Sequence, residues 1–332
     1  LFRRGQYDQP GRPIGPGVPS VLTDGRTPFD ARPPWPGSTK TGRRLALARW
    51  LVDPDHPLTA RVLVNRVWFH HFGRGIVETL SNFGKTGSRP THPRLLDWLA
   101  REFVSHDWSL KQLHRLLMTS SAYRQVSRVA PDSEATDPEN RLLWRMPLKR
   151  MEAEVIRDSI LAVSGRLDPT PFGQPDPVSV RADGLVTSIP GPNGWRRSIY
   201  VQQRRKHMPT ILETFDLPQM IPNCVERPDS TVASQALHLF NDSMIRQLSQ
   251  SFAERVIDEV GAEPYQQVER TYQLALSRRP SDEERELGLA TLAALTARWR
   301  ETEDGDKTPP ETRALFTYCH TILNSAAFLF VD

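Results

Sequence analysis

Most of the sequence consists of segments whose apolar residues recur with the helical period, separated by stretches rich in proline and glycine. These segments cover residues 43–52, 60–72, 93–104, 110–123, 149–165, 230–240, 242–260, 265–278 and 281–300, and a last one begins at Glu311. Only residues 184–203 show the alternation expected of a strand. The pattern predicts a mainly α fold, a multi-helix bundle with long proline-rich loops and a small β element around residues 184–203.

The chain of 332 residues is longer than one ordinary hydrophobic core organises, so we expect two helical subdomains. Residues 1–37, rich in proline and glycine, predict an extended leading segment with little regular structure. The N-terminal helical subdomain is expected over residues 38–129 and, after a charged linker, the C-terminal one over residues 141–332. The second subdomain carries a basic insert of loop and strand at residues 184–209.

Charge and composition exclude some classes of protein. The net charge is only +4, from 43 basic and 39 acidic residues, and no nucleic-acid-binding motif accompanies it, so we expect no nucleic-acid partner. No apolar stretch is long enough to predict a membrane span. The sequence begins at Leu1 without a signal peptide, so we expect any export signal to lie upstream of this segment.

Two adjacent histidines, His70 and His71, end a helical segment in NRVWFHHFGRG and raise the question of a metal site. Two ligands on one helix normally stand three or four residues apart, and this pair does not, so no metal site is predicted. His70 is expected to interact with the C-terminal end of the helix. His71 is expected to be a core histidine satisfied by hydrogen bonds.

The two cysteines, Cys224 and Cys319, form neither a metal-binding spacing nor the C-x-x-C-H motif that attaches a haem covalently. We therefore expect no cofactor in this segment. Cys319 lies in the middle of an apolar helical face and is predicted to be a buried thiol. The sequence leaves the redox state of both cysteines open.

The helical segment 149–165 holds an acidic residue in an unusual position, because Glu152 falls within its apolar arc. Arg150, Glu154, Arg157 and Asp158 share the opposite side, where the i, i+4 ladder of Arg150, Glu154 and Asp158 is predicted to be a solvated stripe of ion pairs. A carboxylate that faces a core needs an arginine or several donors as partners. Glu152 is therefore predicted to anchor a buried ion pair that orders the two subdomains or, alternatively, to act as a general acid or base in a cleft.

The segment GPNGWRRSIYVQQRRKHMP, residues 191–209, carries five basic side chains of Lys and Arg and no acidic residue. In its strand-like part, neighbouring side chains are expected to point to opposite faces. Arginine forks suit the oxyanions of a sulfated or carboxylated glycan. The side chains expected to bind such a ligand are Arg197, Tyr200, Arg204 and Arg205. The alternative is a solvated basic loop whose charges pair with acids elsewhere.

A second polar group occurs in TFDLPQMIPNCVERPDSTVASQALHLFN, which contains Arg227 and Gln235. Gln235 is expected to point away from the apolar face of helix 230–240, to which Val232 and Phe240 belong, and so to be available to solvent or to another segment. Arg227 and Gln235 are therefore further candidate ligand-binding residues. The sequence shows no nucleophile elbow, phosphate loop or zinc-protease motif.

Several motifs follow one another along the chain, among them HPLTARVLVNRVWFHHFGRGIVETLSNFG, DWSLKQLHRLLMTSSAYRQ, LKRMEAEVIRDSILAVSGRLD and STVASQALHLFN. Together they resemble the planctomycete-type domain of unknown function, the PSD-type domain that ends planctomycete proteins containing cytochrome-c modules. The resemblance covers about Lys40 to Asp332. It implies an exported protein, periplasmic or at the cell surface, encoded beside sulfatase-like partners in bacteria that degrade polysaccharides. It also implies that any haem lies in a separate upstream module, and it assigns no catalytic residue.

Two hypotheses about function follow from these observations. In the first, the chain is a binding or scaffold domain whose basic segment contacts an anionic glycan or a partner protein. In the second, it is an enzyme acting on a polysaccharide or its fragments, with Glu152 as acid or base and arginines holding the substrate. An enzyme requires Glu152 and these arginines to converge on one open cleft, whereas a scaffold does not.

Overall fold

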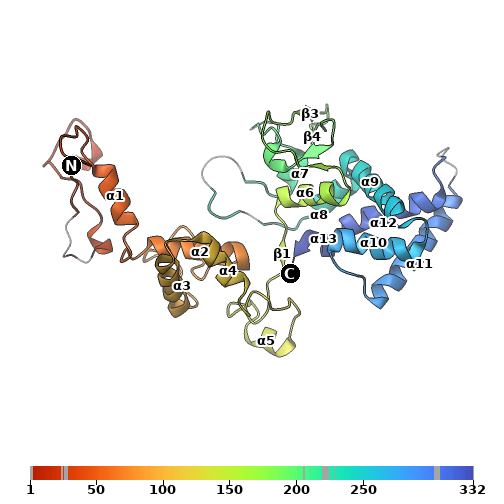
Figure 1. Cartoon of the computed structure of the whole chain (residues 1–332), viewed down its shortest axis with the longest axis horizontal. Coiled ribbons are helices and arrows are strands. Elements are labelled where there is room, and N and C mark those ends of the chain that lie inside the picture. Colours follow the sequence, from red (N-terminus) through yellow and green to blue (C-terminus); the bar gives the residue numbers. More distant parts are fainter. Residues whose placement is uncertain are drawn as a thin grey trace. The chain divides into compact units, whose positions relative to one another are not determined.

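The computed structural model describes residues 3–23, 25, 29–204, 206–218, 224–227, 229–302 and 307–331. Over these ranges the fold is mainly α, as the sequence predicts. The chain divides between Pro147 and Leu148 into two compact units, which are described separately below (Figure 1).

Unit 1, residues 1–147, is built on a small bundle of helices. Its α-helices are α1 (Arg43–Leu51), α2 (Thr59–Phe72), α3 (Pro93–Ser105), α4 (Leu110–Met118) and α5 (Pro131–Thr136). Helices α2, α3 and α4 share a core in which Val64 and Leu99 are at most 1% exposed. Gly73 ends α2 in the left-handed conformation and the Ser109 hydroxyl caps α4, as their positions in the sequence predict.

The leading segment has little regular structure. Its described residues form two short 3-10 turns, η1 (Arg3–Gly5) and η2 (Ser20–Leu22), and none of the side chains described between residues 4 and 37 is buried. Further along, the charged segment at residues 130–140 holds the short helix α5. The bundle of α2, α3 and α4 is therefore the ordered centre of unit 1.

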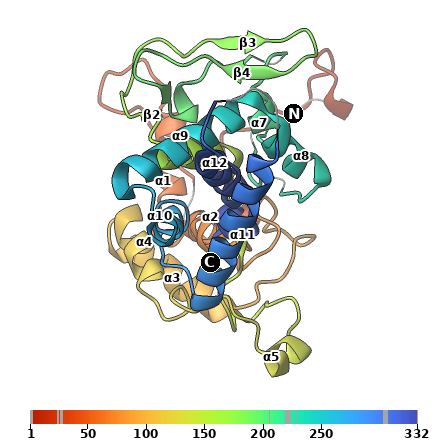
Figure 2. The same ribbon diagram turned by 90° about the vertical axis from the view of Figure 1, so that its right-hand side faces the viewer.

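Unit 2, residues 148–332, carries the larger core. Its α-helices are α6 (Ala153–Val163), α7 (Thr210–Thr214), α8 (Ala233–Asn241), α9 (Ser243–Val260), α10 (Pro264–Leu276), α11 (Asp282–Arg300), α12 (Pro310–Leu323) and α13 (Ala326–Leu329). Helices α9 to α12 lie side by side in Figures 1 and 2. Cys319 of α12 is fully buried in their core, as predicted, and burial raises the pKa of its thiol to about 12.

Six short strands pair two by two in the described part of unit 2. They are β1 (Lys149–Arg150), β2 (Leu167–Asp168), β3 (Val178–Val180), β4 (Val186–Ser188), β5 (Trp195–Arg196) and β6 (Phe330–Val331). β1 pairs with β6, β2 with β5, and β3 with β4, the last pair forming the hairpin seen at the top of Figure 2. The predicted β element thus contains β4 and β5.

The strand predicted through residue 203 stops earlier than expected. Ser198–Tyr200 forms a 3-10 turn, η3, because the amide of Tyr200 donates to the carbonyl of Arg197 at 2.9 Å. The prediction that side chains of residues 197–202 point alternately to opposite faces of a strand is therefore wrong. The turn buries Ser198 and leaves Ile199 79% exposed.

Candidate functional site

Glu152 does not face a core, so that prediction is wrong. The residue precedes the first turn of α6, with φ −67° and ψ 155°, and its side chain is 35% exposed. Because Glu152 lies outside the helix, a helical projection assigns it the wrong direction. Its carboxylate does meet an arginine: Oε2 lies 3.0 Å from Nη1 of Arg227. Both residues belong to unit 2, so this ion pair does not join the two units.

Arg227 is shared between two carboxylates. Its Nη1 also donates to Oε2 of Glu154 at 2.7 Å, and this hydrogen bond raises the pKa of Arg227 above its usual value. The Arg227 side chain is 38% exposed. The carboxylates of Glu152 and Glu154 therefore lie around one cation at the start of α6, at the surface.

The side of α6 predicted to be a solvated stripe is partly buried, and that prediction is also wrong. Arg157 is 1% exposed, and its guanidinium donates to Ser188 Oγ at 2.8 Å, to the Arg196 carbonyl at 3.0 Å and to Ser198 Oγ at 3.2 Å. The basic insert folds back against α6 and supplies these acceptors. Burial lowers the pKa of Arg157, and the nearby Asp158 carboxylate partly offsets that effect.

Asp158 links α6 to the turn η3. Its Oδ1 accepts from the amide of Ser198 at 2.8 Å and from the Ser198 hydroxyl at 2.7 Å. The same oxygen lies 3.3 Å from Nη1 of Arg157, and Oδ2 lies 3.8 Å from Nε of Arg197. Asp158 thus fixes the backbone from which Arg197 projects.

Arg150, the arginine of the predicted solvated stripe, lies in β1 and is buried. Its Nη2 is 2.7 Å from Asp216 Oδ2 and its Nε is 2.7 Å from Asp229 Oδ1. Asp216 in turn accepts from the amide and the hydroxyl of Ser230. The Arg150 side chain is only 4% exposed, so this network holds β1 to the segments around residues 216 and 229.

Gln235 is 4% exposed and is used within the fold. Its amide donates to the Thr214 carbonyl at 3.1 Å and to Ser230 Oγ at 3.2 Å. Gln235 is thus taken up by another segment of the chain, while Val232 and Phe240, expected on the buried face, are 48% and 49% exposed. The predicted apolar face of α8 is therefore wrong in part: Leu239, which belongs to it, is 1% exposed, but the polar network around Asp216 fixes the helix with Gln235 inside.

Arg196 joins the basic insert to the loop at residues 172–176. Its Nε lies 2.7 Å from Asp176 Oδ1, and its two terminal nitrogens donate to the carbonyls of Phe172 and Gln174. The guanidinium lies over the ring of Tyr200, with 5.0 Å between CZ and the ring centroid. Tyr200 is half-buried and thus forms part of this connection.

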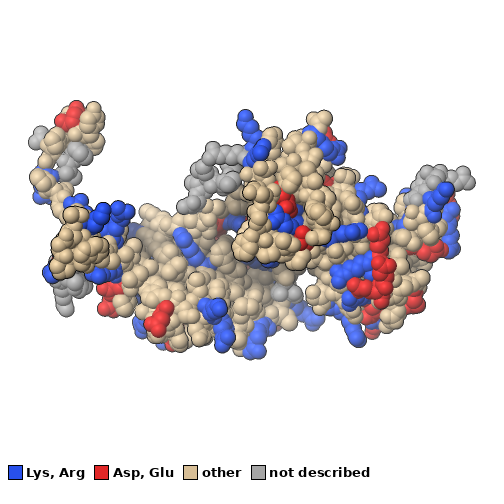
Figure 3. All heavy atoms as spheres, turned by 45° about the horizontal axis from the view of Figure 1, so that its top comes forward, with Lys and Arg blue, Asp and Glu red and all other residues tan. Residues whose placement is uncertain are grey.

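Apart from Arg227, which pairs with Glu152 and Glu154, two of the predicted ligand-binding residues that the structure describes remain at the surface, Arg197 and Arg204. The Arg197 side chain is 65% exposed. Arg204 is also exposed, and its backbone forms an isolated antiparallel bridge with that of His207. Arg205 lies outside the described residues. Figure 3 shows basic side chains spread over the visible surface, with acidic ones adjoining many of them at the right of the view. On this face the basic side chains thus do not form one large field.

The two histidines at the end of α2 belong to unit 1. His71 is half-buried, and its Nε2 lies 2.8 Å from Nδ1 of His114 on α4. The ring of Tyr123 packs edge-on against His71, with 5.4 Å between the ring centroids. His71 therefore has the hydrogen bond expected of it, although it is not fully buried. Among the described residues, no group of three His, Cys, Asp or Glu side chains is arranged to hold a metal ion.

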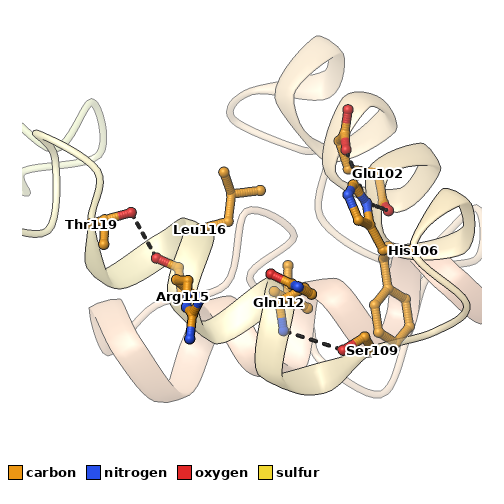
Figure 4. A pocket seen from close by; sticks show the side chains of 9 residues that line it. Glu102, His106, Ser109, Gln112, Arg115, Leu116 and Thr119 are labelled. Carbon is orange, nitrogen blue, oxygen red and sulfur yellow. Dashed lines mark hydrogen bonds and ion pairs between the residues drawn. The ribbon is translucent and has the colours of Figure 1, made fainter.

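A pocket that the sequence did not predict lies between the end of α3 and the face of α4 (Figure 4). Its volume is about 260 Å³. The residues that line it are Glu102, Phe103, His106, Ser109, Gln112, Leu113, Arg115, Leu116 and Thr119. No local signal reveals such a site, because it arises from the angle at which two ordinary amphipathic helices diverge.

The fold and these side chains define a mainly α protein with an internally braced basic insert and a separate small pocket. The chain matches the family PSD1, described as "Protein of unknown function (DUF1553)", over residues 43–292. The chain belongs to this family, as its motifs indicate. No match was found among curated proteins or solved structures. Within the described ranges, no helix combines the length and the apolar character needed to cross a membrane.

Proposed function

We propose that this chain is a binding domain whose basic insert recognises an anionic polysaccharide. The observation that carries the proposal is the state of Arg197. Its side chain is 65% exposed, and its Nε lies 3.8 Å from Oδ2 of Asp158, a carboxylate whose other oxygen already accepts from Ser198. Arg197 thus retains donors for the carboxylate or sulfate group of a ligand.

The backbone around Arg197 supports this role because it is held on both sides. Asp158 binds the amide of Ser198, and the buried Arg157 binds the carbonyl of Arg196. A side chain that projects from a fixed backbone loses less entropy on binding than one from a mobile loop. The insert therefore presents Arg197 in a preorganised position.

Two exposed apolar side chains belong to the same braced region. Ile199 and Phe172 are each 79% exposed, and the carbonyl of Phe172 is bound by Arg196. Phe172 has φ 65°, a conformation that bulky residues rarely adopt because of steric cost. An exposed aromatic ring and an exposed arginine suit a sugar chain, whose rings have apolar C–H faces and whose substituents carry the charge.

The enzyme hypothesis receives less support from the geometry. Glu152 is engaged by Arg227, whereas Arg197 approaches α6 at Asp158. Asp158 lies six positions after Glu152, in the middle of α6, which is roughly 9 Å along the axis. Glu152 thus meets Arg227 before the first turn of α6, whereas the exposed Arg197 meets the middle of the helix.

The resemblance supports two related proposals. We propose that the domain acts outside the cytoplasm, as part of an exported protein, and that any haem of the full-length protein is bound by a different module. Reading the coding sequence upstream of Leu1 tests both, since it would show a signal peptide and a C-x-x-C-H motif.

The binding proposal is tested by retention on immobilised dextran sulfate and on polygalacturonate. Arg197→Ala and Arg204→Ala are expected to elute at lower salt than the parent chain, because each removes an exposed cation. Arg300→Ala is the matched control, since Arg300 is 63% exposed but lies on α11 and pairs with Glu311. A sulfonate cation exchanger run in parallel measures the effect of net charge alone.

If the salt concentration of elution falls equally for all three variants on every column, retention depends on net charge alone and the proposal is contradicted. If the parent chain binds neither polysaccharide at low salt, the glycan proposal is wrong and an acidic partner protein takes its place. The melting temperature of each variant is measured alongside, to exclude loss of fold.

A further inference from the structure

The pocket between α3 and α4 is shaped by the short connection between these helices. Asp107 and Trp108 both have positive φ, 52° and 58°, which turns the chain sharply after Ser105. Trp108 then packs edge-on against Phe103, with 5.3 Å between ring centroids. The connection fixes the angle between the helices, and the space of about 260 Å³ lies where they diverge.

The pocket has an apolar base and a polar rim (Figure 4). Phe103 and Leu113 line it and are 4% and 3% exposed, so they form its base. Leu116 lines one side and is 37% exposed. The exposed part of this apolar surface is small, which suits a ligand with a compact apolar body.

One end of the rim is a histidine–glutamate pair. Nδ1 of His106 lies 2.9 Å from the Glu102 carbonyl oxygen and 3.2 Å from Glu102 Oε2, both acceptors. Both contacts favour the tautomer with its proton on Nδ1, and in that tautomer Nε2 is an acceptor. Together with the second Glu102 oxygen, Nε2 can accept hydrogen bonds from a hydroxyl group.

The α4 side of the rim supplies donors. Arg115 lines the pocket, and among the described residues its guanidinium has no side-chain or backbone partner. The side-chain amide of Gln112, one turn before Leu116, is likewise without a partner in the described part of the chain. A guanidinium fork at this position matches a carboxylate.

We propose that this pocket binds a small amphipathic acid. The carboxylate binds Arg115, the apolar body packs over Leu113 and Leu116, and a hydroxyl at the far end binds the His106–Glu102 pair. A volume of about 260 Å³ holds on the order of a dozen non-hydrogen atoms, slightly fewer than a drug-sized ligand. This site lies in unit 1 and is independent of the polysaccharide proposal, which concerns unit 2.

The experiment is an NMR titration of the full chain with 3-(4-hydroxyphenyl)propionate and, separately, with its primary amide. The acid is expected to shift the amide resonances of residues 102–119 with a dissociation constant on the order of 1 mM. The amide, which lacks the charge, is expected to bind about fivefold more weakly. Both ligands occupy the same apolar base, so only the carboxylate contact differs between them.

Three variants separate the contacts. Arg115→Gln is expected to weaken the acid about fivefold, to the level of the amide, and to leave the amide unchanged. Leu116→Asp is expected to abolish the shifts from both ligands. Arg101→Gln, an exposed arginine on α3 that does not line the pocket, is expected to change neither.

Two results would overturn the proposal. One is the absence of ligand-dependent shifts within residues 102–119 of the parent chain. The other is an Arg115→Gln variant that binds the acid as tightly as the parent does. Because Arg115 and Leu116 are at least partly exposed, both variants are expected to fold, and their amide spectra without ligand verify this.

Discussion

The substitution Arg157→Ala tests the least expected part of the structure, the attachment of the basic insert to α6. The buried guanidinium makes three hydrogen bonds to the insert, at 2.8, 3.0 and 3.2 Å, and lies 3.3 Å from Asp158. Hydrogen bonds to a charged group contribute about 1.5–3 kcal/mol each, but they are not additive and the serine hydroxyls can reorient. Removing one partner of a buried ion pair costs about 3–5 kcal/mol, and we expect a loss of stability in that range.

The matched control is Arg197→Ala. Arg197 lies near the same carboxylate, Asp158, but at 3.8 Å and with its side chain 65% exposed, so its loss should cost less than about 1 kcal/mol. For a unit of this size, about 1 kcal/mol shifts the melting temperature by about 2–4 °C. Arg157→Ala should therefore lower the melting temperature by about 6–20 °C, and Arg197→Ala by no more than about 4 °C.

The assay is thermal and urea unfolding followed by circular dichroism and tryptophan fluorescence. Trp195 is 6% exposed and donates to the Ser188 carbonyl, so it contributes a signal from the insert to the fluorescence of the eight tryptophans. Similar unfolding midpoints for Arg157→Ala and Arg197→Ala would mean that Arg157 does not hold the insert against α6. The structural basis of the polysaccharide proposal, a fixed backbone beneath Arg197, would then fail as well.

Three further predictions follow. A thiol reagent should modify the exposed Cys224 within minutes in the native protein. The same reagent should modify Cys319, which is fully buried and has a pKa of about 12, only after unfolding. Prompt reaction of both cysteines would contradict the packing of the core around Cys319. A hydrogen bond from Arg278 is the main cause that lowers the pKa of Glu284 to about 2. The stability that the Glu284 carboxylate contributes is therefore complete above about pH 4.5 and is lost as the pH falls through 2. Glu284→Gln should remove roughly 1–2 kcal/mol at neutral pH and make the free energy of unfolding fall less steeply at acid pH. Glu152 and Glu154 are both partly exposed and share Arg227, so replacing either by alanine should lower the free energy of unfolding in urea by less than about 1 kcal/mol. A loss above about 3 kcal/mol for Glu152→Ala would mean that Glu152 has the buried role predicted from the sequence.

The helices were predictable because their signals are local. Apolar periodicity, a glycine after α2 and a serine before α4 act within one or two turns of the chain, and the structure follows them closely. The buried position of Cys319 was predictable for the same reason, since its neighbours at helical spacing are all apolar.

The direction of individual charged residues was less predictable. A helical projection treats a face as solvated when it is polar, but the face of α6 with Arg157 is covered by the insert, which supplies its own acceptors. Glu152 was misplaced because α6 begins one residue after it. The buried side of α8 was misjudged because Gln235 binds Thr214, Asp216 and Ser230, which lie outside the helix and fix its rotation. The errors on α6 and α8 depend on contacts with segments outside each helix, which spacing along one segment does not record, whereas the error at Glu152 is one of helix boundary.

The pairing of β1 with β6 places Lys149 opposite Val331, so unit 2 is closed by residues from its two ends. During synthesis, β1 leaves the ribosome long before its partner strand exists. Unit 1 has its own core and contains no segment from beyond Pro147, so it can fold while unit 2 is still incomplete. Unit 2, in contrast, cannot pair β1 with β6 until almost all of its residues have been translated. Until then, the apolar faces of its helices are exposed to chaperones and proteases.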